Sequence, residues 1–225
     1  MSTSHEFKLM QLADSFFPSG TFGTSGGLES LARSGRIKDS RGVLQFIRQQ
    51  LRFQLIPCDC AVFLAVMNAA RKNNIEAAVN ADNACYSIKL VSEVRVASTR
   101  SGRQLLNSMV HVAPTRFAKR FRKKVDSGDS AGTHPACLAV AADSFGIPRK
   151  SALRMMLYSY SAGMVGAALR LGIIQHIDGQ KILNRLAGDI SSVRLAGIYD
   201  IWQLSPLIDI LQMQHERDDL RMFIT

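Results

Sequence analysis

A cluster of glycines near the N-terminus is the part of the sequence closest to an anion-binding motif. A glycine-rich turn that leads into a helix presents free backbone N–H groups to a phosphate or carboxylate. The glycines that follow Pro18 are Gly20, Gly23, Gly26 and Gly27. A nucleotide-binding P-loop also needs a lysine directly after its last glycine, but no lysine lies between Lys8 and Lys38. We therefore expect a compact loop before a helix, with direct ligand binding as the alternative.

The cysteines and histidines give little support for a catalytic or metal site. Cys58 and Cys60 could bind a soft metal as a Cys-x-Cys pair, but they begin a strongly apolar stretch, and free cysteines are usually buried. No two of the 5 histidines lie at i, i+4, and the zinc-binding motif H-E-x-x-H is absent. We expect no catalytic residue, no cofactor and no metal site formed by this chain alone.

The most basic segment of the chain is Arg116–Lys124. Lysine and arginine dominate it, and Phe117 and Phe121 lie at i, i+4, which places both rings on one face of a helix. This pattern predicts an amphipathic helix with an outward, solvated cationic face. The functional alternative is a helix that binds RNA or a membrane surface, and an acidic protein partner is the intermediate case.

A second cluster of charged and small residues spans about three helical turns. It consists of Glu93, Arg95, Ser98, Arg100, Gly102 and Arg103. Such a patch can dock a partner, or it can form an internal network of ion pairs, which contribute little to stability individually. The residue types alone favour neither interpretation.

The overall charge favours acidic partners. The formal net charge is +10 at pH 7, which attracts nucleic acid, an anionic membrane or an acidic protein surface. The first residues lack the basic and then apolar segments of a secretory signal. The most apolar run, Ala61–Met67, is far shorter than the roughly 20 residues that cross a bilayer. We expect a cytoplasmic protein with no membrane segment.

Helical periodicity dominates the segments that must position these residues. Apolar residues from Val43 to Leu55 recur at the spacing of one helix face after a cap at Asp39 or Ser40, and Pro57 is expected to end this helix. The other expected helices are Cys58 to about Arg71, Ile75 to about Met109 (as two helices or one kinked near residues 98–102), Thr115–Val125, His134 or Pro135 to Phe145, Pro148 to about Leu171, a helix capped by Asp178, and a last helix after Ser205-Pro206.

Strand signals are weak throughout the chain. No run of alternating β-branched residues ends in a hairpin turn. The sequence therefore predicts an all-α fold, a single irregular bundle of about nine or ten helices, in one domain over residues 1–225. A short N-terminal tail over about residues 1–6 and a polar loop over about residues 126–132 are expected to lie outside the helices.

Several of these motifs together resemble one protein family. Asp14–Phe22 reads D-S-F-F-P-S-G-T-F and Ser25–Glu29 reads S-G-G-L-E, which resembles the D-S-x-x-P-x-G-x-F/Y…S-x-G-L-E opening of UreF-type urease accessory proteins. Glu93–Leu105 is similar to the family segment E-x-R-x-A-S…G-R-x-L. Arg221–Thr225 is similar to the R-L-F-x-S ending, and the matches follow the family's order from residue 9 to residue 225.

The resemblance implies a function as a scaffold. It implies an all-helical homodimer that binds the UreD/UreH accessory protein and recruits the GTPase UreG, which carries nickel, to apo-urease. We expect neither nucleic acid nor a membrane as the main partner. It also implies that Arg221 lies near the loop Ser19–Gly27 and helps to recruit the GTPase. The partner-binding residues expected from the motifs and the resemblance are Asp14, Pro18, Gly20, Phe22, Ser25, Gly27, Glu29, Glu93, Arg95, Ser98, Arg100, Gly102, Arg103, His215, Arg221 and Phe223.

Two alternatives remain open at this point. In the first, an arginine such as Arg100, Arg103 or Arg221 completes the active site of UreG and activates GTP hydrolysis. In the second, the basic segment Arg116–Lys124 binds nucleic acid, and this binding would fall steeply with salt. The first alternative predicts that an arginine changes the rate of GTP hydrolysis by UreG, which a scaffold alone would not change. The second predicts nucleic-acid binding that depends steeply on salt.

Overall fold

The chain folds into helices, and none of the residues that can be described forms a strand. The computed structural model describes residues 3–14, 16–18, 24–194, 200–216 and 222–223. Because α3, η2 and α4 run on without a break, these residues form 10 helices, which confirms the predicted all-α class. The elements are α1 (Thr3–Ala13), α2 (Leu28–Arg33), α3 (Ser40–Gln50), η2 (Leu51–Cys60), α4 (Ala61–Arg71), α5 (Ile75–Ile88), α6 (Ser92–Val112), α7 (Arg116–Asp126), α8 (His134–Ser144), α9 (Arg149–Arg170), α10 (His176–Ser192) and α11 (Pro206–His215).

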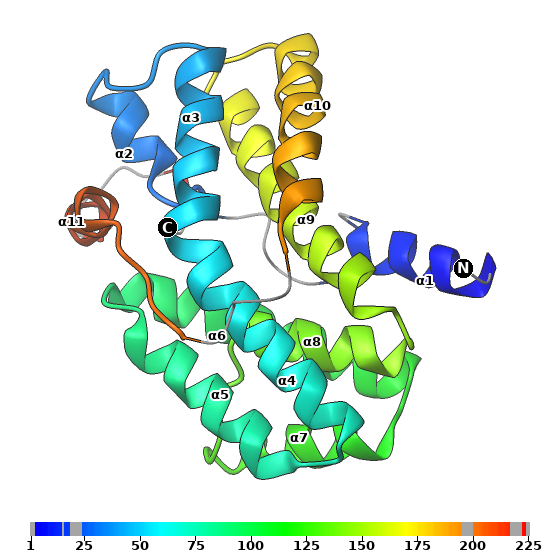
Figure 1. Cartoon of the computed structure of the whole chain (residues 1–225). Helices are drawn as coiled ribbons and strands as arrows, with labels where there is room; N and C mark the ends of the chain where they lie inside the picture. Colours follow the sequence, from blue (N-terminus) through cyan, green and yellow to red (C-terminus); the bar gives the residue numbers. More distant parts are fainter. Residues whose placement is uncertain (1–2, 15, 19–23, 195–199, 217–221, 224–225) are drawn as a thin grey trace.

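A long central helix, formed by α3, η2 and α4, organises the bundle (Figure 1). Helices α9 and α10 pack together beside α3, and α5 to α8 gather around α4 at the other end. Helix α11 packs against α2, and α1 packs against α9. The helices at both ends of this central helix share one hydrophobic core cluster, whose fully buried members include Ile47, Phe63, Phe121 and Leu157.

Pro57 lies inside the central helix, so the prediction that it ends the helix is wrong. Proline has no N–H, and its ring clashes with the carbonyl four residues earlier, which belongs to Phe53. Here the helix widens into the π-helical segment η2. The Phe53 carbonyl accepts a hydrogen bond from the Leu204 N–H at 3.0 Å, and the Pro57 carbonyl accepts one from the Trp202 N–H at 3.2 Å. A distant segment, residues 202–204, therefore supplies hydrogen-bond donors to two carbonyls of this π-helical segment.

The central helix as a whole, Ser40–Arg71, is long and apolar enough to cross a membrane by length and composition alone. In the folded protein, 67% of its most apolar window is buried. Val62, Phe63 and Met67 are completely buried against other helices. These features are those of a core helix, as expected for Ala61–Met67.

The segment from Ile75 to Met109 forms two helices, and the break falls at residues 89–91, not near residues 98–102. The Arg95 guanidinium donates hydrogen bonds to the carbonyl of Lys89 at 2.6 Å and to that of Leu90 at 2.9 Å. These carbonyls at the end of α5 would otherwise lack helical partners. Arg95 therefore stabilises the break.

Gly102 lets α6 approach the loop that precedes α8. A Cβ atom on Gly102 would lie 2.3 Å from the Gly132 carbonyl oxygen and 2.8 Å from the His134 nitrogen. We expect Gly102→Ala to lower the free energy of unfolding by about 1–3 kcal/mol, because neighbouring backbone must move. Chemical denaturation measures this change. Gly188→Ala on α10 is the matched control, since a Cβ there meets nothing within 4 Å and alanine favours the helix. Equal losses in both variants would contradict this packing account.

Two helix starts differ from the sequence predictions. Helix α1 begins at Thr3, so the tail predicted over about residues 1–6 is wrong from residue 3 onward. Helix α10 begins at His176 after an N-cap at Gln175, and Asp178 lies in its first turn. A carboxylate there still interacts favourably with the positive end of the helix dipole.

Candidate partner-binding site

The N-terminal motif and the C-terminal segment meet at the carboxylate of Glu29 in α2. Glu29 is buried and accepts backbone hydrogen bonds from the Met222 N–H at 2.9 Å and the Phe223 N–H at 3.2 Å. These donors directly follow Arg221, which lies outside the described residues. Glu29 thus joins segments that are 194 positions apart in the chain. We call this set of contacts the Glu29 junction.

His215, on α11, connects the Glu29 junction to α6. Its Nε2 atom lies 3.2 Å from the Glu29 Oε2 atom, and its Nδ1 atom lies 3.4 Å from the Glu93 Oε2 atom. The imidazole is only 2% exposed. Three helices and the C-terminal segment are therefore held together by one imidazole and two carboxylates. All three residues were predicted as partner-binding residues from the sequence, but no feature of the sequence indicated that they contact one another.

Close packing fixes the segments on either side of the junction. Phe223 is buried, and the Arg170 guanidinium of α9 lies 4.4 Å from its ring centroid, a favourable cation–π distance. Gly27 has a φ of 90°, which L side chains rarely adopt. A Cβ atom on it would also lie 3.0 Å from the Ile208 side chain of α11. Gly27 is therefore required for the contact between α2 and α11.

The remaining residues of the N-terminal motif differ in exposure. Ser25 is completely buried, whereas Asp14 and Pro18 are exposed. The Asp14 carboxylate accepts a hydrogen bond from the Phe16 N–H at 2.7 Å, which fixes the turn after α1. Gly20 and Phe22 lie outside the described residues.

The Glu29 junction is expected to weaken at acid pH. Burial by itself raises the pKa of Glu29, but hydrogen bonds from the Met222 N–H, His215 and the Phe223 N–H lower it below the ordinary value of 4.5. A carboxylate whose pKa is lower in the folded state than in the unfolded state stabilises the fold fully at pH values above its ordinary pKa. This stabilisation is lost as the pH falls through the folded-state pKa. Hydrogen-exchange protection of the Met222 and Phe223 amides should therefore decrease below about pH 4.5. Glu29→Gln should abolish this step, and a step that persists in that variant would contradict the assignment.

The predicted patch on α6 is used mainly for internal contacts. Arg95 caps α5, as described above, and Arg103 donates to the Ala131 carbonyl at 3.3 Å. The Ser98 hydroxyl accepts a hydrogen bond from the His134 N–H at 3.2 Å. The two arginines therefore bond to backbone carbonyls, which differs from the ion-pair network considered from the sequence. Arg100 is exposed on the same helix.

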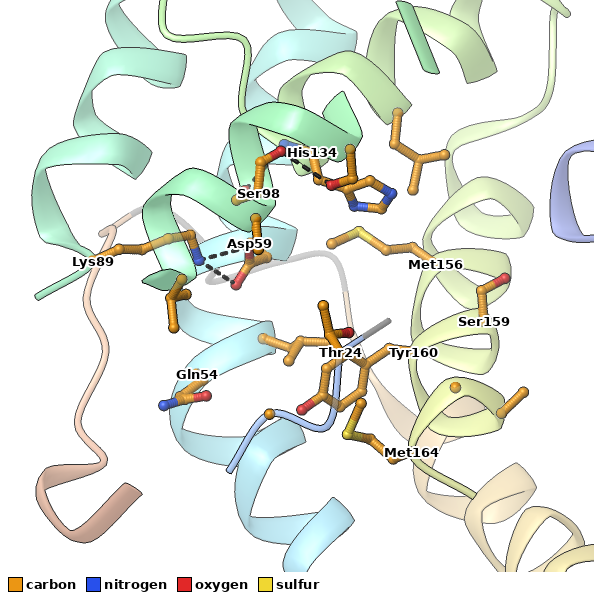
Figure 2. Close-up of a pocket in the computed structure, with 18 of the residues that line it drawn as sticks. Thr24, Gln54, Asp59, Lys89, Ser98, His134, Met156, Ser159, Tyr160 and Met164 are labelled. Atoms are coloured by element: carbon orange, nitrogen blue, oxygen red, sulfur yellow. Dashed lines mark hydrogen bonds and ion pairs between the residues drawn. The ribbon is translucent and has the colours of Figure 1, made fainter. Parts of the chain in front are cut away.

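A cavity of about 380 Å³ lies beside the glycine loop, between η2, α6, α8 and α9 (Figure 2). Thr24 and Gly26 line it on the side of the loop, and Tyr160 lines it on the side of α9. The Lys89 Nζ atom contacts the two Asp59 carboxylate oxygens at 3.0 and 3.3 Å within the cavity wall. This ion pair is mostly buried, with side-chain exposures of 7% and 15%.

The protonation states of the cavity residues follow from their burial and from this ion pair. Burial by itself lowers the pKa of the Lys89 ammonium, but the adjacent Asp59 carboxylate outweighs it and leaves the pKa above its ordinary value. Burial lowers the pKa of His134 to about 4, so its imidazole is neutral near pH 7. The cavity therefore contains a charged pair and a neutral imidazole. Sequence reasoning missed the pair, although Asp59 is a carboxylate within an apolar stretch.

A second buried carboxylate, Asp82 on α5, holds the loop between α7 and α8. It accepts hydrogen bonds from the Ser130 hydroxyl at 2.6 Å, the Gly132 N–H at 2.6 Å, the Thr133 N–H at 2.9 Å and the Thr133 hydroxyl at 2.5 Å. This loop falls where the sequence predicted it. Asp82 was not selected from the sequence, because its partners lie about 50 positions away.

The thiols and histidines of the described segments are not arranged as a metal site. Within those segments, no group of three or more His, Cys, Asp or Glu side chains is placed to hold a metal ion. Cys58, Cys60, Cys85 and Cys137 are all free and buried, as predicted for the Cys58–Cys60 pair. Burial raises the pKa of the Cys60 and Cys137 thiols, which disfavours the thiolate that binds metals.

The fold and the Glu29 junction define an all-helical protein in which one buried carboxylate of α2 holds α11 and residues 222–223. The chain belongs to the UreF family of urease accessory proteins: a family model described as UreF matches residues 37–187. It is 31% identical over 224 residues to the urease accessory protein UreF of Trichodesmium erythraeum (strain IMS101), over 98% of this chain and 97% of that protein. It is also 31% identical over 227 residues to UreF of Yersinia enterocolitica, over 99% of both chains.

Proposed function

We propose that this chain is an adaptor in urease maturation. As a cytoplasmic homodimer it binds the UreD/UreH accessory protein and recruits the GTPase UreG, with its nickel, to apo-urease. The chain itself carries out no catalysis and holds no cofactor, and the nickel is handled by the whole complex. Membership of the UreF family supports the link to urease.

The observation that carries this proposal is the Glu29 junction. It fixes α2, α11 and residues 222–223 relative to one another, so that a partner would meet a preorganised surface. Leu207, Ile210 and Met213 lie three residues apart on α11 and are 47%, 54% and 42% exposed. Exposed apolar side chains grouped in this way are typical of protein interaction sites.

A co-purification experiment tests the adaptor directly. The tagged chain is mixed with UreD/UreH and UreG homologues, and the products are separated by size exclusion with light scattering. We expect a complex that contains all three proteins. If neither partner binds under conditions in which both bind another member of the UreF family, the adaptor proposal is wrong.

A second candidate function is activation of the GTPase by an arginine supplied in trans. Arg100 and Arg103 are both exposed, but Arg100 suits this role better, because the Arg103 guanidinium already donates to the Ala131 carbonyl. If Arg100 acts in this way, Arg100→Ala should lower the maximal rate of GTP hydrolysis by UreG at a saturating concentration of this chain. For an adaptor alone, we expect an unchanged maximal rate in the variant.

A further inference from the structure

Helix α7 presents a row of positive charge at the end of the molecule away from α2 and α3 (Figure 1). Arg116, Lys119, Arg120 and Lys123 are spaced i, i+3, i+4 and i+7, so they share one helix face. The opposite face, with Phe117, Ala118, Phe121 and Val125, is buried in the core. We call the four cations the basic stripe.

The basic stripe is available to a partner. Arg116, Lys119 and Lys123 are exposed, and Arg120 is held in place because it donates to the Asn73 side-chain oxygen at 3.0 Å. Lys72, which precedes Asn73 and is exposed, extends the positive surface beyond the helix. The stripe covers about 10 Å along the helix axis at 1.5 Å per residue.

Carboxylates limit the basic stripe at the end of α7. The Arg122 Nε atom lies 3.2 Å from Asp126, and the Lys124 Nζ atom lies 3.5 Å from Glu76 and 3.3 Å from Asp129. A continuous phosphate backbone that crossed this surface would meet these acidic groups. An anionic partner that contacts the basic stripe and avoids these carboxylates must therefore be short.

The position of the aromatic side chains also argues against nucleic acid. Single-stranded nucleic acid is bound by stacking of bases on exposed aromatic rings between cations. The rings of Phe117 and Phe121 lie 6.5 Å apart in a stacked arrangement, but both are buried and face the core. The stripe offers charge without a stacking surface.

We propose that the basic stripe docks an acidic segment of a partner protein, with carboxylates spaced along one helix face or a short loop. Charge complementarity steers such a partner and fixes its orientation, and the acidic end of α7 sets the direction in which it binds. The stripe is separate from the Glu29 junction, so this proposal can succeed or fail independently of the adaptor function.

Fluorescence anisotropy at low ionic strength tests the proposal with defined probes. The probes are a labelled alanine-rich peptide with Glu at i, i+3, i+4 and i+7, and a single-stranded DNA of the same net charge. The variant Lys119→Glu/Lys123→Glu reverses the stripe. The control Lys181→Glu/Arg185→Glu reverses two exposed cations on α10 with the same spacing and the same change in net charge.

We expect the stripe variant to weaken peptide binding by at least about tenfold, and the control variant by less than about twofold. Lys119→Gln/Lys123→Gln, which removes the charge without reversing it, should give an intermediate loss. Circular dichroism verifies that each variant remains helical. Equal losses in the stripe and control variants, no peptide binding by the wild type, or tighter binding of the DNA than of the peptide would each overturn the proposal.

Discussion

Replacing Glu29 with alanine is expected to detach the C-terminal segment and to lower the free energy of unfolding by about 2–4 kcal/mol. The carboxylate accepts the N–H groups of Met222 and Phe223 and contacts the buried His215 at 3.2 Å. Alanine removes the acceptor from all three donors at once. Chemical denaturation measures the loss of stability, and hydrogen exchange of the Met222 and Phe223 amides measures the detachment.

Glu216→Ala is the matched control for this prediction. Glu216 is a carboxylate at the end of α11 that accepts a hydrogen bond from the Ser92 hydroxyl at 2.9 Å, but it is exposed. Water replaces its single partner at little cost, so the variant should retain nearly the wild-type stability and protection. Comparable effects of the two substitutions would show that burial of Glu29 does not matter.

Replacing Asp82 with alanine is expected to cause the largest loss of stability, about 3–5 kcal/mol. Its carboxylate accepts hydrogen bonds from side chains and backbone of Ser130, Gly132 and Thr133, and Asp82, Ser130 and Thr133 are all buried. The substitution leaves these donors without an acceptor and away from water. This loss is a large part of the 5–15 kcal/mol typical of a folded domain, so the thermal midpoint should fall by many degrees.

Asp129→Ala, in the same loop region, distinguishes a buried acceptor from an exposed one. Asp129 contacts Lys124 at 3.3 Å and the Ser127 hydroxyl at 3.1 Å, but these contacts are exposed. We expect its thermal midpoint to remain close to that of the wild type. A midpoint for Asp82→Ala as high as that of Asp129→Ala would contradict the role assigned to Asp82.

Local signals in the sequence predicted most helix boundaries. Asp39 caps α3 by accepting from the Gly42 N–H, and Thr115 caps α7 by accepting from the Ala118 N–H, as predicted. Ser205 and Pro206 begin α11, also as predicted. Such caps can be predicted because donor and acceptor are three residues apart. Pro57 was misjudged because the donor to the Phe53 carbonyl comes from Leu204, which no local rule anticipates.

The candidate site was only partly accessible from the sequence for the same reason. Motifs selected Glu29, Glu93 and His215 individually, but their mutual contacts depend on helices that are 122 to 186 positions apart in the chain. The Lys89–Asp59 pair has no spacing signal at all, because its partners lie on η2 and just after α5. Gly102 was selected as a partner-binding residue, whereas the structure shows it buried against the Gly132–His134 backbone.

In the proposed adaptor, the Glu29 junction holds α2, α11 and residues 222–223 in the surface that a partner binds. The most direct test is titration of a UreG homologue into a preformed complex of this chain with a UreD/UreH homologue. We expect Glu29→Ala to weaken the affinity at least about tenfold, or roughly 1.4 kcal/mol, and Glu216→Ala to leave it unchanged. The same affinity for wild type and both variants would contradict the claim.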